Sequence, residues 1–117
     1  MRDTKQREQI CLLAKSMFDR GLTAGASGNI SVRCEDGSLL VTPTGACFGR
    51  LDPAQLAHIS PAGQHLAGDA PTKEMSLHSA FYDSRQNTGA VVHLHSSHSV
   101  ALSMVTPIEE GTPFCRR

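Results

Sequence analysis

Residues 90–100 read AVVHLHSSHSV, a short apolar run followed directly by three histidines. The β-branched residues of this run predict that the surrounding segment, TGAVVHLH at 88–95, forms a strand. Residues two apart on a strand share a face, so His93 and His95 are expected to point together while Leu94 points away. That spacing allows two imidazoles to share one metal ion, although two ordinary core histidines would fit the same pattern.

A metal site needs more than these two side chains, because a catalytic zinc ion normally has three protein ligands and an open position. His98 is a poor third ligand, since it falls at the start of a helix predicted over 97–104. Glu74 is either a carboxylate stabilised at a helix start or a general acid/base aimed at a substrate held on the metal. The other histidines are expected to be surface or packing residues, and these are His58, His65 and His78.

The N-terminal part of the chain predicts a helix followed by two hairpins. The helix is expected to begin at Asp3, with Gln6 in capping-box spacing, and to end at the glycine Gly21. The turn EDGS at 35–38 predicts a hairpin of strands 30–33 and 39–42, and the turn PAG at 61–63 predicts one of 56–60 and 64–68. The expected apolar face of the helix consists of Ile10, Leu13, Ala14 and Met17.

A second helix is expected to begin at Pro71–Thr72, where the hydrophobic period changes. Helices that alternate with short hairpin-linked strands predict an α/β fold, in which helices flank a mainly antiparallel central sheet in αβα layers. The length of 117 residues supports a single domain, expected to span 1–117.

Composition narrows the class of protein. Eleven basic and eleven acidic residues give a formal net charge of zero, and no Lys/Arg cluster favours a nucleic-acid partner. No apolar run approaches the roughly 18 residues of a membrane span, and the first nine residues have no signal-peptide pattern. The four cysteines are widely spaced, so free thiols in a reducing cytoplasm are expected.

Two loops could bind an anion. GASGN at 25–29 and TPTG at 42–45 combine glycine with small polar side chains, so that backbone N–H groups can approach an anion closely. The predicted helix start at Thr72–Lys73 would add a helix dipole and a cation. Taken alone, a loop of this kind is more often just an ordinary turn.

The order and spacing of four motifs strongly resemble the class II aldolase/adducin family. The motifs are GASGNISVR, LLVTPTG, PTKE and AVVHLHSSHS, and the resemblance runs from Glu8 to Met104. It implies a class II aldolase-like fold, a phosphorylated sugar or sugar-acid substrate, and a divalent metal cofactor, with Zn²⁺ preferred over Mn²⁺. It also implies a cytoplasmic homo-oligomer, a tetramer, for a full-length member.

The resemblance assigns a role to each residue that matches a family motif. Glu74 matches the catalytic acid/base, and His93 and His95 match two of the three metal-binding histidines. The positions that match the family's binding site for the substrate phosphate are Asn29, Thr44, Gly45, Thr72 and Lys73.

Within the family, the amino-acid sequences of the motifs most resemble those of the 3-oxo-tetronate 4-phosphate decarboxylases. That similarity implies a metal-dependent lyase that forms dihydroxyacetone phosphate and CO₂ through a metal-stabilised enediolate. Two alternatives remain, a sugar-phosphate aldolase of the fuculose-phosphate type and a non-catalytic, adducin-like association module.

The family's chain continues well beyond this length and supplies the third metal histidine. The present sequence is therefore expected to be a C-terminally truncated, partial domain, with a divergent tail at 105–117. As given, the chain is expected to bind metal weakly and to be a poor catalyst.

Overall fold

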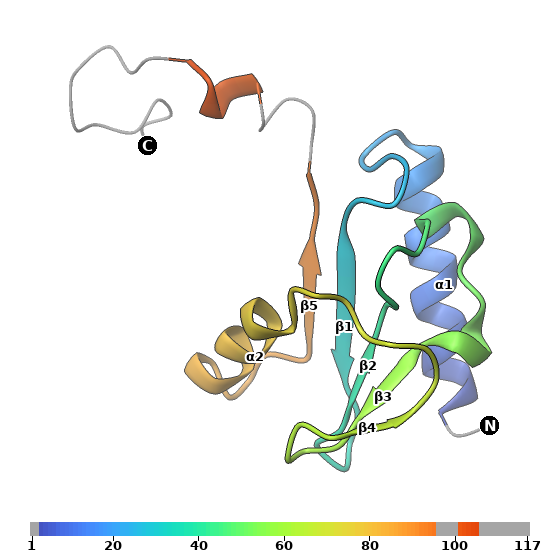
Figure 1. The fold of residues 1–117 in the computed structure, drawn as a ribbon, viewed down its shortest axis with the longest axis vertical. Coiled ribbons are helices and arrows are strands. Elements are labelled where there is room, and N and C mark those ends of the chain that lie inside the picture. The colour runs from blue at the N-terminus through green and yellow to red at the C-terminus, as the bar shows by residue number, and fades with distance from the viewer. Residues whose placement is uncertain (1–2, 96–100, 106–117) are drawn as a thin grey trace.

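The computed structural model describes residues 3–95 and 101–105, which build a five-stranded sheet with helices on both faces (Figure 1). The strand order is β4-β3-β2-β1-β5, and every neighbouring pair is antiparallel. The elements are α1 (Thr4–Asp19), β1 (Asn29–Arg33), β2 (Leu39–Val41), the short 3-10 helices η1 (Phe48–Arg50) and η2 (Pro53–Gln55), β3 (Ala57–Ile59), β4 (His65–Ala67), α2 (Met75–Ser84) and β5 (Ala90–His93).

Both predicted hairpins are confirmed. In the β1–β2 turn, the Asp36 carboxylate accepts hydrogen bonds from the backbone N–H and the hydroxyl of Ser38, at 2.9 and 2.5 Å. The β3–β4 turn contains Gly63 at φ 92°, a conformation that favours glycine. After β4 the chain crosses through α2 and returns as β5 on the opposite edge of the sheet, beside β1 (Figure 1).

Side chains along the strands point alternately to the two faces of the sheet, one packed against α1 and the other against α2. Ile30 and Leu40 lie in the core cluster with Ile10 and Ala14 of α1. The next residue of β1, Ser31, faces the other side of the sheet and contacts α2. The predicted αβα layering is therefore confirmed.

The first helix differs from its prediction in two details. Asp3 has φ 56° and its side chain makes no capping hydrogen bond, so the predicted capping box is wrong. Leu13 is 61% exposed, because each residue turns about 100° around the helix axis and places Leu13 to the side of the buried line Arg7, Ile10 and Ala14. Gly21 does end the helix, with φ 75°.

Strand β5 shows how incompletely the sheet edge is covered. Val91 is buried on the face of the sheet that carries α2, whereas Val92, on the opposite face, is 53% exposed. Of the helix predicted over 97–104, residues 101–103 are helical, and residues 96–100, with His98, lie outside the described part of the chain.

The predictions on membrane spans and cysteines can be compared with the structure. In the described segments 3–95 and 101–105, no helix is long and apolar enough to cross a membrane. Cys11, Cys34 and Cys47 are free thiols, as expected, and Cys115 lies outside those segments.

Candidate active site

Glu74 is positioned by a pairing that the sequence did not predict. Residues 70–72 run antiparallel to residues 42–44 and exchange backbone hydrogen bonds with them at 2.9 and 3.1 Å. Because this pairing holds the segment extended, α2 begins only at Met75, with Glu74 as its N-cap residue. The predicted helix start at Pro71–Thr72 is therefore wrong by about one turn.

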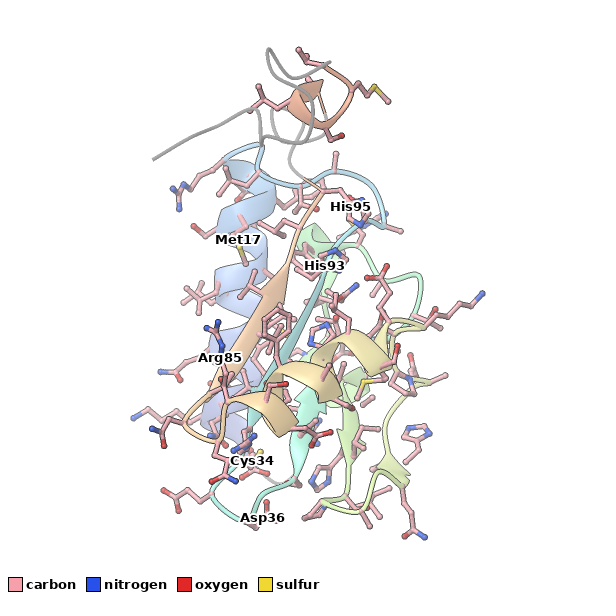
Figure 2. The ribbon with its side chains drawn as sticks, turned by 90° about the vertical axis from the view of Figure 1, so that its left-hand side faces the viewer. Met17, Cys34, Asp36, Arg85, His93 and His95 are labelled. Atoms are coloured by element: carbon pink, nitrogen blue, oxygen red, sulfur yellow. The ribbon has the colours of Figure 1, made fainter. Side chains whose placement is uncertain are left out.

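His93 and His95 approach Glu74 from the end of β5. The sheet register places His93 opposite Asn29, on the face of the sheet that carries α2. Leu94 packs against the core of the α1 side, so His95 returns to the face of His93, as the alternation of a strand requires. The two imidazole centroids are 4.9 Å apart. Figure 2 shows the two histidines at the end of the sheet opposite Cys34 and Asp36.

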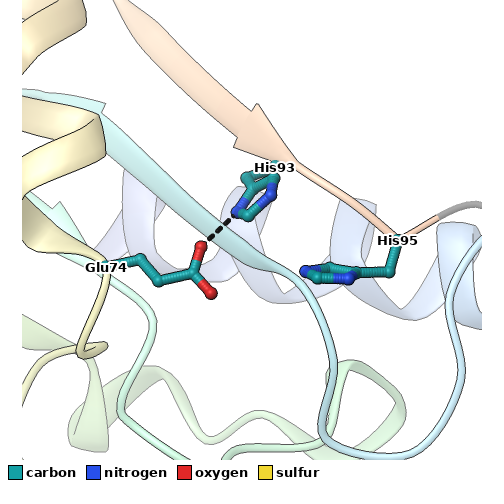
Figure 3. Close-up of side chains that lie close together, drawn as sticks. All are labelled: Glu74, His93 and His95. Atoms are coloured by element: carbon teal, nitrogen blue, oxygen red, sulfur yellow. Dashed lines mark ion pairs between the residues drawn. The ribbon is translucent and has the colours of Figure 1, made fainter. Parts of the chain in front are cut away.

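The three side chains converge on one point (Figure 3). One ligand atom each from Glu74, His93 and His95 lie within 4.8 Å of one another. Glu74 Oε2 lies 2.5 Å from His93 Nδ1. Glu74 and His93 are half-buried, and His95 is exposed, so the cluster is open to solvent on the His95 side.

These residues fit a divalent metal. His93 Nδ1 is buried, yet it has no hydrogen bond of good geometry among the described residues, and its close neighbour is a carboxylate oxygen. A cation placed between the two groups would satisfy both of them at once. Two histidines and a glutamate also form one of the three-ligand sets that catalytic zinc sites use.

The segments that carry the candidate phosphate-binding residues meet at the same end of the sheet. The N–H of Ile30, next to Asn29, donates to the Thr42 hydroxyl at 3.0 Å, and Thr42 in turn pairs with Thr72. Direct hydrogen bonds thus join the loop TPTG both to the segment before α2 and to Ile30, the residue that follows the loop GASGN.

Individually, the five candidate residues are placed differently. Asn29 and Thr72 are buried, and Lys73 is exposed just before α2, not in its first turn. Thr44 and Gly45 are exposed and line a separate cavity of about 340 Å³ that does not include Glu74. The five residues are therefore neighbours along one edge without sharing one closed pocket.

His78 belongs to this region, although the sequence indicated only a surface or packing residue. It is fully buried on α2, one turn after Glu74, and its ring bonds both Asn29 and Ser31. The spacing of four residues between Glu74 and His78 was the available signal, because such residues share a helix face. His58 is buried and bonds Ser38, and His65 is exposed.

Comparison with known proteins gives the family. The model of the class II aldolase and adducin N-terminal domain matches residues 8–116. The 3-oxo-tetronate 4-phosphate decarboxylase of Cupriavidus necator is 47% identical over 102 residues, which are 87% of this chain and 46% of that protein. The L-fuculose phosphate aldolase of Escherichia coli is 38% identical over 90% of this chain and 48% of its own length.

Solved structures agree with this result. The crystal structure of YgbL from Escherichia coli superposes with a TM-score of 0.88 at 39% identity, and the match covers 97% of this chain and 55% of that one. The chain belongs to the class II aldolase/adducin family and has its fold. It spans about half the length of the curated relatives that it matches.

We expect His93→Ala to abolish most zinc binding by the 117-residue chain. Removing even a hydrogen-bond partner of a metal ligand costs about 10–100-fold in affinity, so loss of a ligand should cost at least about 100-fold. Competition with a chelator of known affinity measures the change. His65→Ala, at an exposed histidine on β4, is the matched control and should bind zinc like the unchanged chain. Equal binding by His93→Ala and His65→Ala would place the ion elsewhere.

Proposed function

We propose that this chain carries the N-terminal, site-bearing part of a metal-dependent carbon–carbon lyase. Its reaction is the decarboxylation of 3-oxo-tetronate 4-phosphate to dihydroxyacetone phosphate and CO₂, and its location is the cytoplasm. The observation that carries the proposal is the convergence of Glu74, His93 and His95, in a chain 47% identical to a decarboxylase of this name. The full-length protein would assemble as a homo-oligomer, a tetramer.

Each part of the site has a chemical task in this proposal. His93 and His95 hold the divalent metal, which supplies Lewis-acid stabilisation of the negative charge that develops on the substrate oxygens. Glu74 lies next to that position and delivers a proton to the substrate carbon that loses CO₂. The substrate phosphate is held by Asn29, Thr44, Gly45, Thr72 and Lys73, which fixes the far end of the molecule.

The region around Glu74 suits a proton carrier. The carboxylate is half-buried and close to His93, so it is shielded from bulk water on one side. It also stands at the N-terminal end of α2, beside the candidate metal-binding histidines. Its proposed role is that of the acid/base, and mutation separates this role from that of a third metal ligand.

A chimera tests the proposed reaction. Residues 1–104 of this chain are joined to the C-terminal part of the Cupriavidus necator decarboxylase, which completes the domain with a sequence of the same family. We expect this chimera to release CO₂ and dihydroxyacetone phosphate from 3-oxo-tetronate 4-phosphate, with both products followed by NMR.

Two other results would each favour a different function. Aldehyde release from L-fuculose 1-phosphate, without decarboxylation of the sugar acid, would move the assignment to the aldolases. A folded, zinc-binding chimera without either activity would favour the association module. The intact Cupriavidus necator protein serves as the positive control.

A further inference from the structure

A chain of buried hydrogen bonds links α2 to Asn29 at the end of β1. The Tyr82 hydroxyl lies 2.8 Å from Ser31 Oγ, and Ser31 Oγ lies 2.6 Å from His78 Nδ1. On the other side of the ring, His78 Nε2 contacts Asn29 Oδ1. All four side chains are at most 6% exposed, so water competes little for these bonds.

The orientation of the Asn29 amide sets the direction of the chain. Its oxygen faces the ring and only accepts, so His78 Nε2 carries the proton that it donates to Asn29 Oδ1. In the neutral ring Nδ1 then accepts, and Ser31 supplies the hydroxyl proton to it. The Ser31 oxygen is left to accept from the Tyr82 hydroxyl. Each bond therefore points the same way, toward Asn29, and bonds aligned in this manner strengthen one another.

The surroundings keep the members of this chain neutral. Burial lowers the pKa of His78, and nearby His93 lowers it further, although the Glu74 carboxylate acts in the opposite direction. Burial raises the pKa of the Tyr82 hydroxyl, so that it stays protonated and can donate.

This chain of hydrogen bonds determines which group of the Asn29 amide is left for a ligand. Its oxygen is bound by His78, and no hydrogen bond from its Nδ2 group is found within residues 3–95 and 101–105. An amide free to rotate would present oxygen or nitrogen to a ligand, and an oxygen would repel an anion. Fixing the oxygen inward leaves two N–H donors for an anionic ligand.

We propose that His78 is a positioning residue: with Ser31 and Tyr82 it locks the Asn29 amide so that Nδ2 donates to the substrate phosphate. This inference rests on the phosphate role of Asn29 in the proposed function. His78 also lies one helical turn after Glu74. The same end of α2 therefore orients both Glu74, the proposed proton carrier, and Asn29, the proposed phosphate donor.

The first test needs no ligand and no mutation. Long-range ¹H–¹⁵N correlation spectra of the 117-residue chain report which ring nitrogen of His78 carries the proton. We expect the proton on Nε2. A proton on Nδ1 would reverse every bond of the chain, turn the amide oxygen of Asn29 outward and overturn the proposal.

The second test measures the effect on an anion. Inorganic phosphate is titrated into the unchanged chain, His78→Gln and His78→Phe, while the NH₂ signals of Asn29 are followed. A glutamine amide nitrogen stands close to the position of Nε2 and can still donate to Asn29, whereas phenylalanine fills the space without a donor. We expect similar phosphate affinity for the unchanged chain and His78→Gln, and about tenfold weaker affinity for His78→Phe.

The outcomes separate the two proposals. Equal affinity in His78→Phe would overturn the positioning role. A proton on Nε2, together with Asn29 signals that phosphate does not move, would overturn the phosphate role of Asn29 and thus the part of the proposed function on which this inference rests. If His78→Phe fails to fold, as its backbone spectrum would show, the tautomer of the unchanged chain still decides the direction of the hydrogen bonds.

Discussion

Replacing Glu74 by Gln in the active chimera should lower kcat by about 10²–10⁴-fold, the range that general acid–base catalysis contributes. Glutamine keeps the size of the side chain and can still hydrogen-bond, but it cannot carry the proton at neutral pH. If the carboxylate acts only as a proton carrier, the zinc content of Glu74→Gln should match that of the parent protein.

The close approach of the carboxylate to His93 makes the zinc measurement decisive. Glu74 Oε2 lies 2.5 Å from His93 Nδ1, within the cluster of candidate ligand atoms. A loss of zinc that parallels the loss of kcat would therefore assign Glu74 as a ligand and contradict its proposed catalytic role. The control is Glu35→Gln, an exposed carboxylate in the β1–β2 turn, which should leave both kcat and zinc content unchanged.

Gly68→Ala is expected to be the most destabilising single-methyl change among the described glycines. The new Cβ would lie 2.1 Å from the carbonyl oxygen of Leu56 and 2.8 Å from its carbon, and both are backbone atoms that cannot move without displacing β3. Gly68 also has φ 80°, which is strained for any residue with a Cβ. We expect the free energy of unfolding to fall by about 3 kcal/mol, measured by urea denaturation.

Gly63→Ala separates the two contributions. Gly63 has a similar backbone conformation, with φ 92°, but a Cβ at this position would meet nothing within 4 Å. Its replacement should therefore cost only the conformational strain, about 1 kcal/mol. Equal losses at the two positions would mean that β3 yields easily and that the contact with Leu56 is unimportant. Because Gly68 opens the segment that leads to Glu74, its replacement should also weaken zinc binding.

The elements of the fold were predictable because their signals are local. The turn residues at 35–38 and 61–63 and the alternation of β1 identify the hairpins, since turn chemistry and a period of two depend only on near neighbours. The histidine pair was predictable for the same reason: the geometry of a strand places His93 and His95 on one face wherever the strand lies. The similarity of four motifs to one family then indicated which segments belong to one site.

The start of α2 and the environment of Asn29 depended on contacts between distant segments. Pairing of residues 70–72 with 42–44 holds Thr72 extended and delays the helix to Met75, and no local pattern reveals a partner 28 residues away. Likewise, burial of His78 against Ser31 requires α2 to lie across β1. The sequence by itself determined which elements form and which side chains can carry chemistry. Only the tertiary structure decided where the second helix begins and which polar groups are paired, because long-range backbone pairing and burial outweigh local propensity.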